Sequence, residues 1–456
     1  MIKNWLSKAP PTVFTIYTTV CAYCVYFCMY GLRKPFSGIG YDGHNPVDYF
    51  GELFVFDNGR SLKFKAILVF SQVVGYTLSK FIGIKFISEL KSSHRLLAIL
   101  SFVAFAEFTL LLFAILPHQW KPIALFLNGL PLGMIWGLVM VFLEGRKTSD
   151  VLGAGLCCSF IMASGITRST GRWLMTVFEN MGEFWMPFWT GLVYIIPLFL
   201  FAWLLAQIPP PTEEDIRERA KREPMNRSDR FQFLKTYRLG FIPIVISYIL
   251  FTIIRSYRDD FGSDIFKDNG ITAPAAYATS ETIIGFVIAI LLGCLILIRN
   301  NRKALLFNYL IIISGLVLAL VSNCMFVQKS IDSFTWMVLI GLGLYMAYVP
   351  LQCFFFDRLL ACLRTTANVA FLIYIADFSG YLGTLFILLY KDLWAPKGQN
   401  HSDVMVDLVY VASVTGIGLI IFSFVTFNRQ TKDPVADGRQ HRGDDWTKRL
   451  RRITRP

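Results

Sequence analysis

Long apolar segments alternate with short polar connectors along most of the chain. A helix needs about 20 mostly apolar residues to cross the hydrocarbon core of a bilayer. Segments of this kind lie at residues 11–33, 63–88, 95–117, 121–143, 151–176, 183–208, 239–258, 275–298, 303–326, 333–357, 362–390 and 404–428. The pattern predicts an all-α membrane protein with twelve transmembrane helices.

The longest internal polar stretch, residues 209–238, opens with three prolines and is dense in charges of both signs. This composition is typical of a linker between domains. It predicts an N-terminal six-helix bundle at 1–208, a charged cytoplasmic linker at 209–238 and a C-terminal six-helix bundle at 239–428. A basic cytoplasmic tail would follow at 429–456.

Composition supports a membrane protein. Of the 456 residues, 55% are hydrophobic and only 16% are charged, whereas soluble domains are about 25% charged. This excludes a disordered chain, a fibrous rod and a small disulfide scaffold. The net charge of +13 could suggest nucleic-acid binding. However, the basic residues concentrate in the termini, the even-numbered connectors and the linker, so we expect a lipid bilayer and no nucleic acid as partner.

That distribution also predicts the orientation. Lys and Arg prefer the cytoplasmic side of a membrane protein. The odd-numbered connectors are poor in them, and Lys34, Lys121 and Arg258 are among the few they contain. We therefore expect both termini in the cytoplasm, in a multi-pass protein of a bacterial cytoplasmic (inner) membrane that is a monomer.

The cysteines and histidines give little sign of metal or catalytic chemistry. All nine cysteines lie in or at the ends of apolar segments, and the five histidines are scattered in or beside loops. Packing is the favoured role for the cysteines. We expect no metal, no cofactor and no enzymatic activity.

Charged residues inside the spans call for an explanation, because each costs about 2.5–3.5 kcal/mol even on the gentlest scale. The basic ones are Arg33, Lys80, Arg168, Arg172 and Arg255, and the acidic ones are Glu107, Glu281 and Asp377. The excess of cations predicts a central cavity for an anion, because arginine binds phosphate or carboxylate with a planar fork of donors. Alternatively, Arg33 and Arg255 snorkel to the head groups, and Arg168 pairs with Glu179 or Glu183.

An internal repeat supports a role in the cavity for two of these cations, Arg33 and Arg255. Tyr26 precedes Arg33 by seven residues in the first span, and Tyr248 precedes Arg255 by seven in the seventh. Parallel repeats that meet at a central site are a common transporter design. The repeat predicts that Arg33 and Arg255 face one cavity from opposite halves.

The first span, CVYFCMYGLRKPFS, resembles that of the organophosphate–phosphate antiporters of the major facilitator superfamily through Tyr26, Tyr30, Arg33, Lys34 and Phe36. Further similar segments are GYTLSKFIG with Lys80, SYILFTIIRSY with Arg255, SETIIGFVIAILLG with Glu281, MAYVP with Tyr348 and FSGYLGT with Tyr381. The resemblance implies the major facilitator fold and a substrate phosphate bound by Arg33 and Arg255. A histidine of that family's fifth span has no counterpart here, where MASGITRST places Arg168 nearby.

We therefore expect a secondary active transporter of a small organic anion, for example a phosphorylated metabolite exchanged for phosphate, working by alternating access. The expected substrate-binding residues are Arg33, Arg255, Lys80, Tyr26, Tyr30, Tyr348, Tyr381 and Arg168, with Glu281 and Asp377 for coupling or charge pairing. Two alternatives stay open: a transporter-like membrane sensor for a similar anion, and a proton-coupled carboxylate symporter in which Glu281 or Asp377 carries the proton.

Overall fold

The computed structural model describes residues 2–51, 62–90, 92–143, 149–210, 227–298, 300–363, 365, 369–394, 396 and 399–432. Within these residues, twelve helices are long and apolar enough to cross a membrane. The predicted all-α protein with twelve spanning helices is confirmed. Most of the predicted linker (211–226) and of the predicted tail (433–456) lies outside the described residues.

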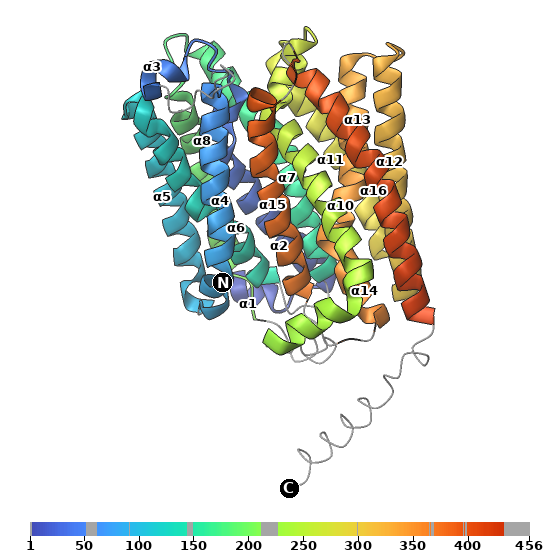
Figure 1. The fold of residues 1–456 in the computed structure, drawn as a ribbon. Helices are drawn as coiled ribbons and strands as arrows, with labels where there is room; N and C mark the ends of the chain where they lie inside the picture. Colours follow the sequence, from blue (N-terminus) through green and yellow to red (C-terminus); the bar gives the residue numbers. More distant parts are fainter. Residues whose placement is uncertain are drawn as a thin grey trace.

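Two sets of six long helices stand side by side (Figure 1). The first set is α2 (Pro11–Arg33), α4 (Phe64–Glu89), α5 (Arg95–Ile115), α6 (Lys121–Leu143), α7 (Ser149–Val177) and α8 (Met186–Ala206). The second set is α10 (Arg227–Asp268), α11 (Pro274–Ile296), α12 (Asn301–Val327), α13 (Ser333–Pro350), α15 (Val369–Leu393) and α16 (His401–Lys432). Helix α13 continues through a π-helical turn, η5 (Leu351–Phe355), into α14 (Phe356–Leu363).

Short helices mark the two ends of the bundle. Helix α3 (Pro46–Phe50) lies at the upper end in Figure 1, and α1 (Ile2–Leu6) lies with α14 at the lower end. The turns η1 (Pro35–Gly38), η3 (Ser92–His94) and η4 (His118–Trp120) connect neighbouring helices. The two ends are named the α3 end and the α14 end below.

Helix α10 is longer than the apolar pattern predicts. It begins at Arg227, inside the predicted linker, and ends at Asp268 instead of residue 258. Hydropathy detects only the part of a helix that faces lipid or the core. The polar extension beyond residue 258 continues as helix because its carboxylates find cationic partners on the first half, including Lys34 and Lys65.

Glycines allow close approach between helices of the first half. A Cβ on Gly75 of α4 would collide with the backbone oxygen of Phe126 of α6, and a Cβ on Gly129 would collide with that of Gln72. Small residues at such crossings let helix backbones touch, which is how spans pack in the absence of a hydrophobic driving force. The two halves meet mainly along α7 with α11 and along α4 with α15.

Candidate functional site

Two buried arginines face each other's half of the molecule. Arg33 is the last residue of α2 and Arg255 lies within α10, and their exposed fractions are 5% and 8%. Neither guanidinium makes a hydrogen bond or ion pair with the described residues, and the Nε of each is buried without a partner. Both cations are therefore held inside the protein without an anionic neighbour in the described chain.

Aromatic rings surround these two cations. The Arg33 guanidinium lies 3.8 Å from the ring centre of Tyr76 and 5.6 Å from that of Tyr30. The Arg255 guanidinium lies 4.9 Å from the ring centre of Tyr348. A ring face attracts a cation by about 0.5–2 kcal/mol, which offsets only part of the cost of burying it.

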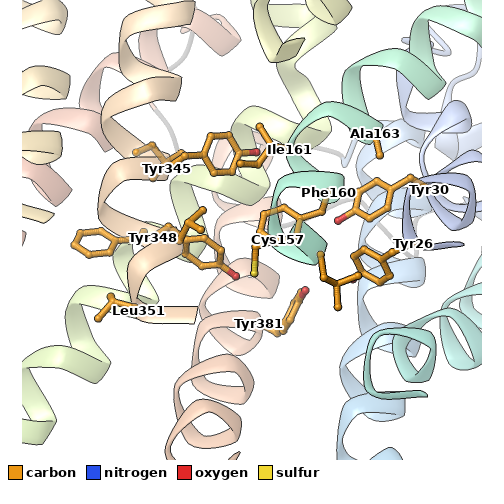
Figure 2. Packing of buried hydrophobic residues seen from close by; sticks show 14 of the residues in the cluster. Tyr26, Tyr30, Cys157, Phe160, Ile161, Ala163, Tyr345, Tyr348, Leu351 and Tyr381 are labelled. Atoms are coloured by element: carbon orange, nitrogen blue, oxygen red, sulfur yellow. The ribbon is translucent and has the colours of Figure 1, made fainter. Parts of the chain in front are cut away.

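Two tyrosines connect the environments of the two arginines. Tyr30 and Tyr381 each interact electrostatically with both Arg33 and Arg255. The four tyrosines Tyr26, Tyr30, Tyr348 and Tyr381 are all buried. Figure 2 shows their rings arranged around Phe160 and Cys157. Together with Tyr76, the two arginines and these four tyrosines form the aromatic cage. In this conformation the cage is closed to solvent.

A third cation, Lys80 of α4, borders the cage. Its Nζ lies 5.4 Å from the ring centre of Tyr76 and 3.9 Å from an oxygen of Asp377, which belongs to α15 of the other half. Asp377 also accepts hydrogen bonds from the Tyr248 hydroxyl and from the Gln352 amide, the latter at 2.7 Å. This ion pair joins the halves beside the aromatic cage.

A cluster of buried charged side chains joins the two halves between the cage and the α3 end. It consists of Lys34, Arg168, Asp259 and Asp260 and is called the latch below. The Lys34 Nζ lies 2.6 Å from a carboxylate oxygen of Asp259 and 2.6 Å from one of Asp260. Arg168 lies 3.4 Å from Asp259 and 3.7 Å from Asp260. Two cations of the first half thus neutralise two carboxylates of the second.

Further contacts surround the latch. Arg168 donates to the Ser37 hydroxyl at 2.9 Å, and the Ser164 hydroxyl donates to Asp259. Arg258, one helical turn from Arg255 on α10, pairs with Glu281 of α11, and both are almost fully buried. Of these contacts, only the hydrogen bond from Ser164 to Asp259 crosses between the halves, whereas Arg168–Ser37 lies within the first half and Arg258–Glu281 within the second.

The structure gathers most of the predicted site residues. Arg33, Arg255, Lys80, Tyr26, Tyr30, Tyr348 and Tyr381 line or border the cage, and Asp377 pairs with Lys80. It places Arg168 in the latch, paired with Asp259 and Asp260 and not with Glu179 or Glu183, and it pairs Glu281 with Arg258.

Several residues of the site escaped the sequence pattern. Lys34 and Arg258 were expected in connectors, but both are buried in ion pairs, with 3% and 1% of their surfaces exposed. Tyr76 also belongs to the cage, although only Lys80 was predicted as a site residue in the segment GYTLSKFIG that contains it. Two signals for the latch were available in the sequence: Arg168 inside a span, and the consecutive acids Asp259 and Asp260 just past another span.

The cage has the chemistry of an anion site. Two guanidinium groups offer planar forks of donors, and charged hydrogen bonds are roughly twice as strong as neutral ones. An ion without a partner in a low-dielectric interior carries a penalty of several kcal/mol. A small anion that contacted both arginines would remove much of that penalty. Among the described residues, no group of His, Cys, Asp and Glu side chains could hold a metal ion.

Comparison with known proteins supports the fold. The sequence profile of DUF5690, a family of unknown function, matches residues 51–430, and no curated protein matches the chain in sequence. Solved structures with a similar fold include a bacterial homologue of the human lysosomal transporter Spinster, in an inward-facing, unoccupied conformation. It has 11% identity and a TM-score of 0.52, and the match covers 93% of this chain and 97% of that one.

Two further similar structures are transporters of other solutes. A point mutant of the peptide transporter POT has 12% identity and a TM-score of 0.58, covering 92% of this chain and 96% of its own. A point mutant of the nucleoside transporter NupG has 16% identity and a TM-score of 0.53, covering 91% and 99%. These neighbours are transporters of the major facilitator type. At such low sequence identities, the structural similarity establishes the fold but not the substrate. The chain has the major facilitator fold and is a multi-pass membrane protein.

Proposed function

The chain belongs to the DUF5690 family, and we propose that it is a secondary active transporter that moves a small organic anion between its two halves. One observation carries this proposal: Arg33 and Arg255 are buried, come from opposite halves and have no anionic partner in the described chain. A ligand that bridged them would bind more tightly when the halves are close. Such differential affinity is what a ligand needs to drive a conformational change.

A phosphorylated metabolite exchanged for phosphate is the proposed substrate pair. Phosphate presents several acceptor oxygens, so it can accept from two guanidinium forks at once. The resemblance to organophosphate–phosphate antiporters includes these same two arginines among its motifs, and it supports that substrate class. Exchange also follows from the charge of the cage, because unneutralised arginines would resist passage of the empty carrier through the membrane.

The proposed setting is a bacterial cytoplasmic membrane, with the α14 end inside the cell and the protein acting as a monomer. The charge pattern of the connectors supports this orientation. A reporter fused after Lys432, at the end of α16, would then be cytoplasmic, and a reporter active only outside the cytoplasm would overturn the orientation.

The direct test is exchange of radiolabelled phosphate by purified protein in proteoliposomes, with unlabelled phosphate, phosphoesters and carboxylates as competitors. Arg33→Lys and Arg255→Lys keep the charge but lose the planar fork, so each should weaken binding at least tenfold. The double variant should lose little more, because the first substitution already removes the bidentate hydrogen bonding on one side of the anion, so the bridge between the halves is broken. Arg302→Lys, at an exposed position on α12, is the matched control.

The result that would overturn the proposal is equally clear. If the arginines only reached toward head groups, lysine would replace them with little effect. Wild-type binding in both lysine variants would remove these residues from the site. Binding without exchange would instead support the transporter-like sensor.

A second candidate is proton-coupled symport of a carboxylate, which the contact between Lys80 and Asp377 favours. The two residues come from opposite halves and lie 3.9 Å apart. Protonation of Asp377 would release Lys80 to bind a substrate carboxylate. In this case a proton gradient alone would drive accumulation, and Asp377→Asn would abolish the effect of the gradient. Phosphate exchange without a gradient would favour the first candidate.

A further inference from the structure

Two cysteine sulfurs lie in contact across the interface between the halves. Cys157 belongs to α7 and Cys353 to the π-helical turn η5, and their Sγ atoms are 2.9 Å apart. These two elements pack directly against each other. All nine cysteines lie in the described residues and none forms a disulfide.

The contact is close to bonding distance. A disulfide has an S–S bond of about 2.05 Å, so the two sulfurs would need to approach by only about 0.9 Å. Cys353 also sits in a π-helical turn, a local irregularity that is frequent at functional sites.

The surroundings place this pair at the boundary of the aromatic cage. Cys157 is 3% exposed and lies one turn from Phe160, whose ring is 6.4 Å from that of Tyr348. Figure 2 shows Cys157 among the cage tyrosines. Cys353 follows Gln352, which donates to Asp377, and is partly exposed. Cys353 is therefore the more exposed residue of the pair and the one that a reagent meets first.

We propose that Cys157 and Cys353 form a redox-active thiol pair, which a low-molecular-weight disulfide oxidises to a disulfide that bridges the two halves. The Cys353 thiol loses its proton to water, and the resulting thiolate attacks one sulfur of the small disulfide and expels the other as a thiolate, which takes up a proton from water. The Cys157 thiol loses its proton in the same way, and its thiolate attacks Cys353 in this mixed disulfide and expels the second small thiolate, which is then protonated. Two Sγ–H bonds break, one Sγ–Sγ bond forms, and the reagent takes up two electrons and leaves as two thiols.

The bridge would fix α7 to η5 and so tie the halves at the level of the cage. If the halves must separate there for substrate to pass, oxidation stops transport and reduction restores it. This consequence rests on the proposed function, whereas formation of the bridge does not. The two can therefore be tested separately.

The first experiment detects the bridge itself. Full-length protein in detergent is incubated with glutathione disulfide, alkylated and digested with trypsin. Cys157 and Cys158 fall in the peptide 148–168, and Cys353 falls in the peptide 330–358. A linked pair of these peptides is expected in wild type and in Cys158→Ser, the matched control, because the neighbouring sulfur is not the one in contact. It should be absent in Cys157→Ser and Cys353→Ser.

The second experiment measures the consequence. Oxidised wild type should lose most of its phosphate exchange and recover it on addition of dithiothreitol, and Cys353→Ser should be insensitive to the oxidant. Absence of the linked peptides in Cys158→Ser would overturn the thiol-pair assignment. A linked pair without any loss of exchange would keep the thiol pair but show that the halves do not separate at this level. Absence of exchange in the reduced protein would count against the proposed function alone.

Discussion

Loss of Lys34 should open the bundle at the α3 end. In Lys34→Met, two adjacent buried carboxylates, Asp259 and Asp260, keep only Arg168 as a cationic partner, at 3.4 and 3.7 Å. Both of their short contacts, at 2.6 Å, disappear. The latch then changes from neutral to a net charge of −1, in a place where the lysine side chain was only 4% exposed.

The size of the effect follows from burial. Removing one partner of a buried ion pair costs about 3–5 kcal/mol, and each 1.4 kcal/mol is a factor of about ten in an equilibrium constant. The equilibrium between closed and open states at the α3 end should therefore shift by more than about a hundredfold. Lys267→Met is the matched control, because its partner Asp42 lies 2.7 Å away in a pair that is 63% and 66% exposed. An exposed pair of this kind is worth less than about 1 kcal/mol.

The assay is the distance distribution between spin labels at Glu179 and Ser330, which lie at the α3 end of different halves. Lys34→Met should populate a longer distance, and Lys267→Met should not. Adding Asp260→Asn to Lys34→Met returns the latch to neutrality and should restore much of the short distance. Identical distributions in the two lysine variants would refute the reasoning, because the buried pair would then contribute no more than the exposed one.

Other substitutions probe packing, capping and buried charge. Gly129→Ala should destabilise the protein by about 1–3 kcal/mol through overpacking, whereas Gly293→Ala, where a Cβ meets nothing within 4 Å, should be neutral or stabilising in chemical unfolding. Asp332 caps α13 by accepting from the backbone N–H of Phe334, so Asp332→Ala should cost about 1 kcal/mol in the same measurement. The Thr335 side chain and the cap hydrogen bonds lower the pKa of Asp332 below its ordinary value of 3.8. The stability that the ionised carboxylate contributes is therefore present above the ordinary pKa of 3.8 and is lost as pH falls through the lowered pKa. Asp332→Asn, which keeps a cap, should therefore lose less stability than wild type as pH falls below 3.8. Both carboxylate oxygens of Glu107 are buried without a hydrogen-bond partner in the described chain, so Glu107→Met should raise stability by about 1–3 kcal/mol, and a lower melting temperature would contradict this.

The spans were predictable because hydropathy is a local property. The predicted segments 11–33 and 121–143 coincide with α2 and α6. The extension of α10 was not predictable in this way, because its polar residues are stabilised by partners on another helix. Hydropathy treats Asp259 and Asp260 as solvent-facing, although both are buried.

Only those site residues that are charged and lie in apolar segments could be predicted from the sequence pattern alone. Arg33, Arg255 and Lys80 stand out because cations in spans are rare. The amino-acid sequence does not reveal which of the charged residues form ion pairs. In the latch, for example, Lys34 pairs with Asp260, which lies more than two hundred residues away along the chain. The contact of Cys157 with Cys353 was likewise hidden, because each cysteine alone is an ordinary packing residue in an apolar helix.

Helices α2 and α10 carry the cage and the latch together. Arg33 and Lys34 are consecutive, and Arg255 and Asp259 are one turn apart, about 6 Å along the axis of α10. If the two halves rotate against each other as rigid bodies in the proposed transport cycle, the angle between α2 and α10 changes two distances together: the separation of the two arginines and the separation of the latch charges. The pair farther from the rotation axis would move apart more for the same rotation. Anion binding and opening at the α3 end would then be coupled through one angle.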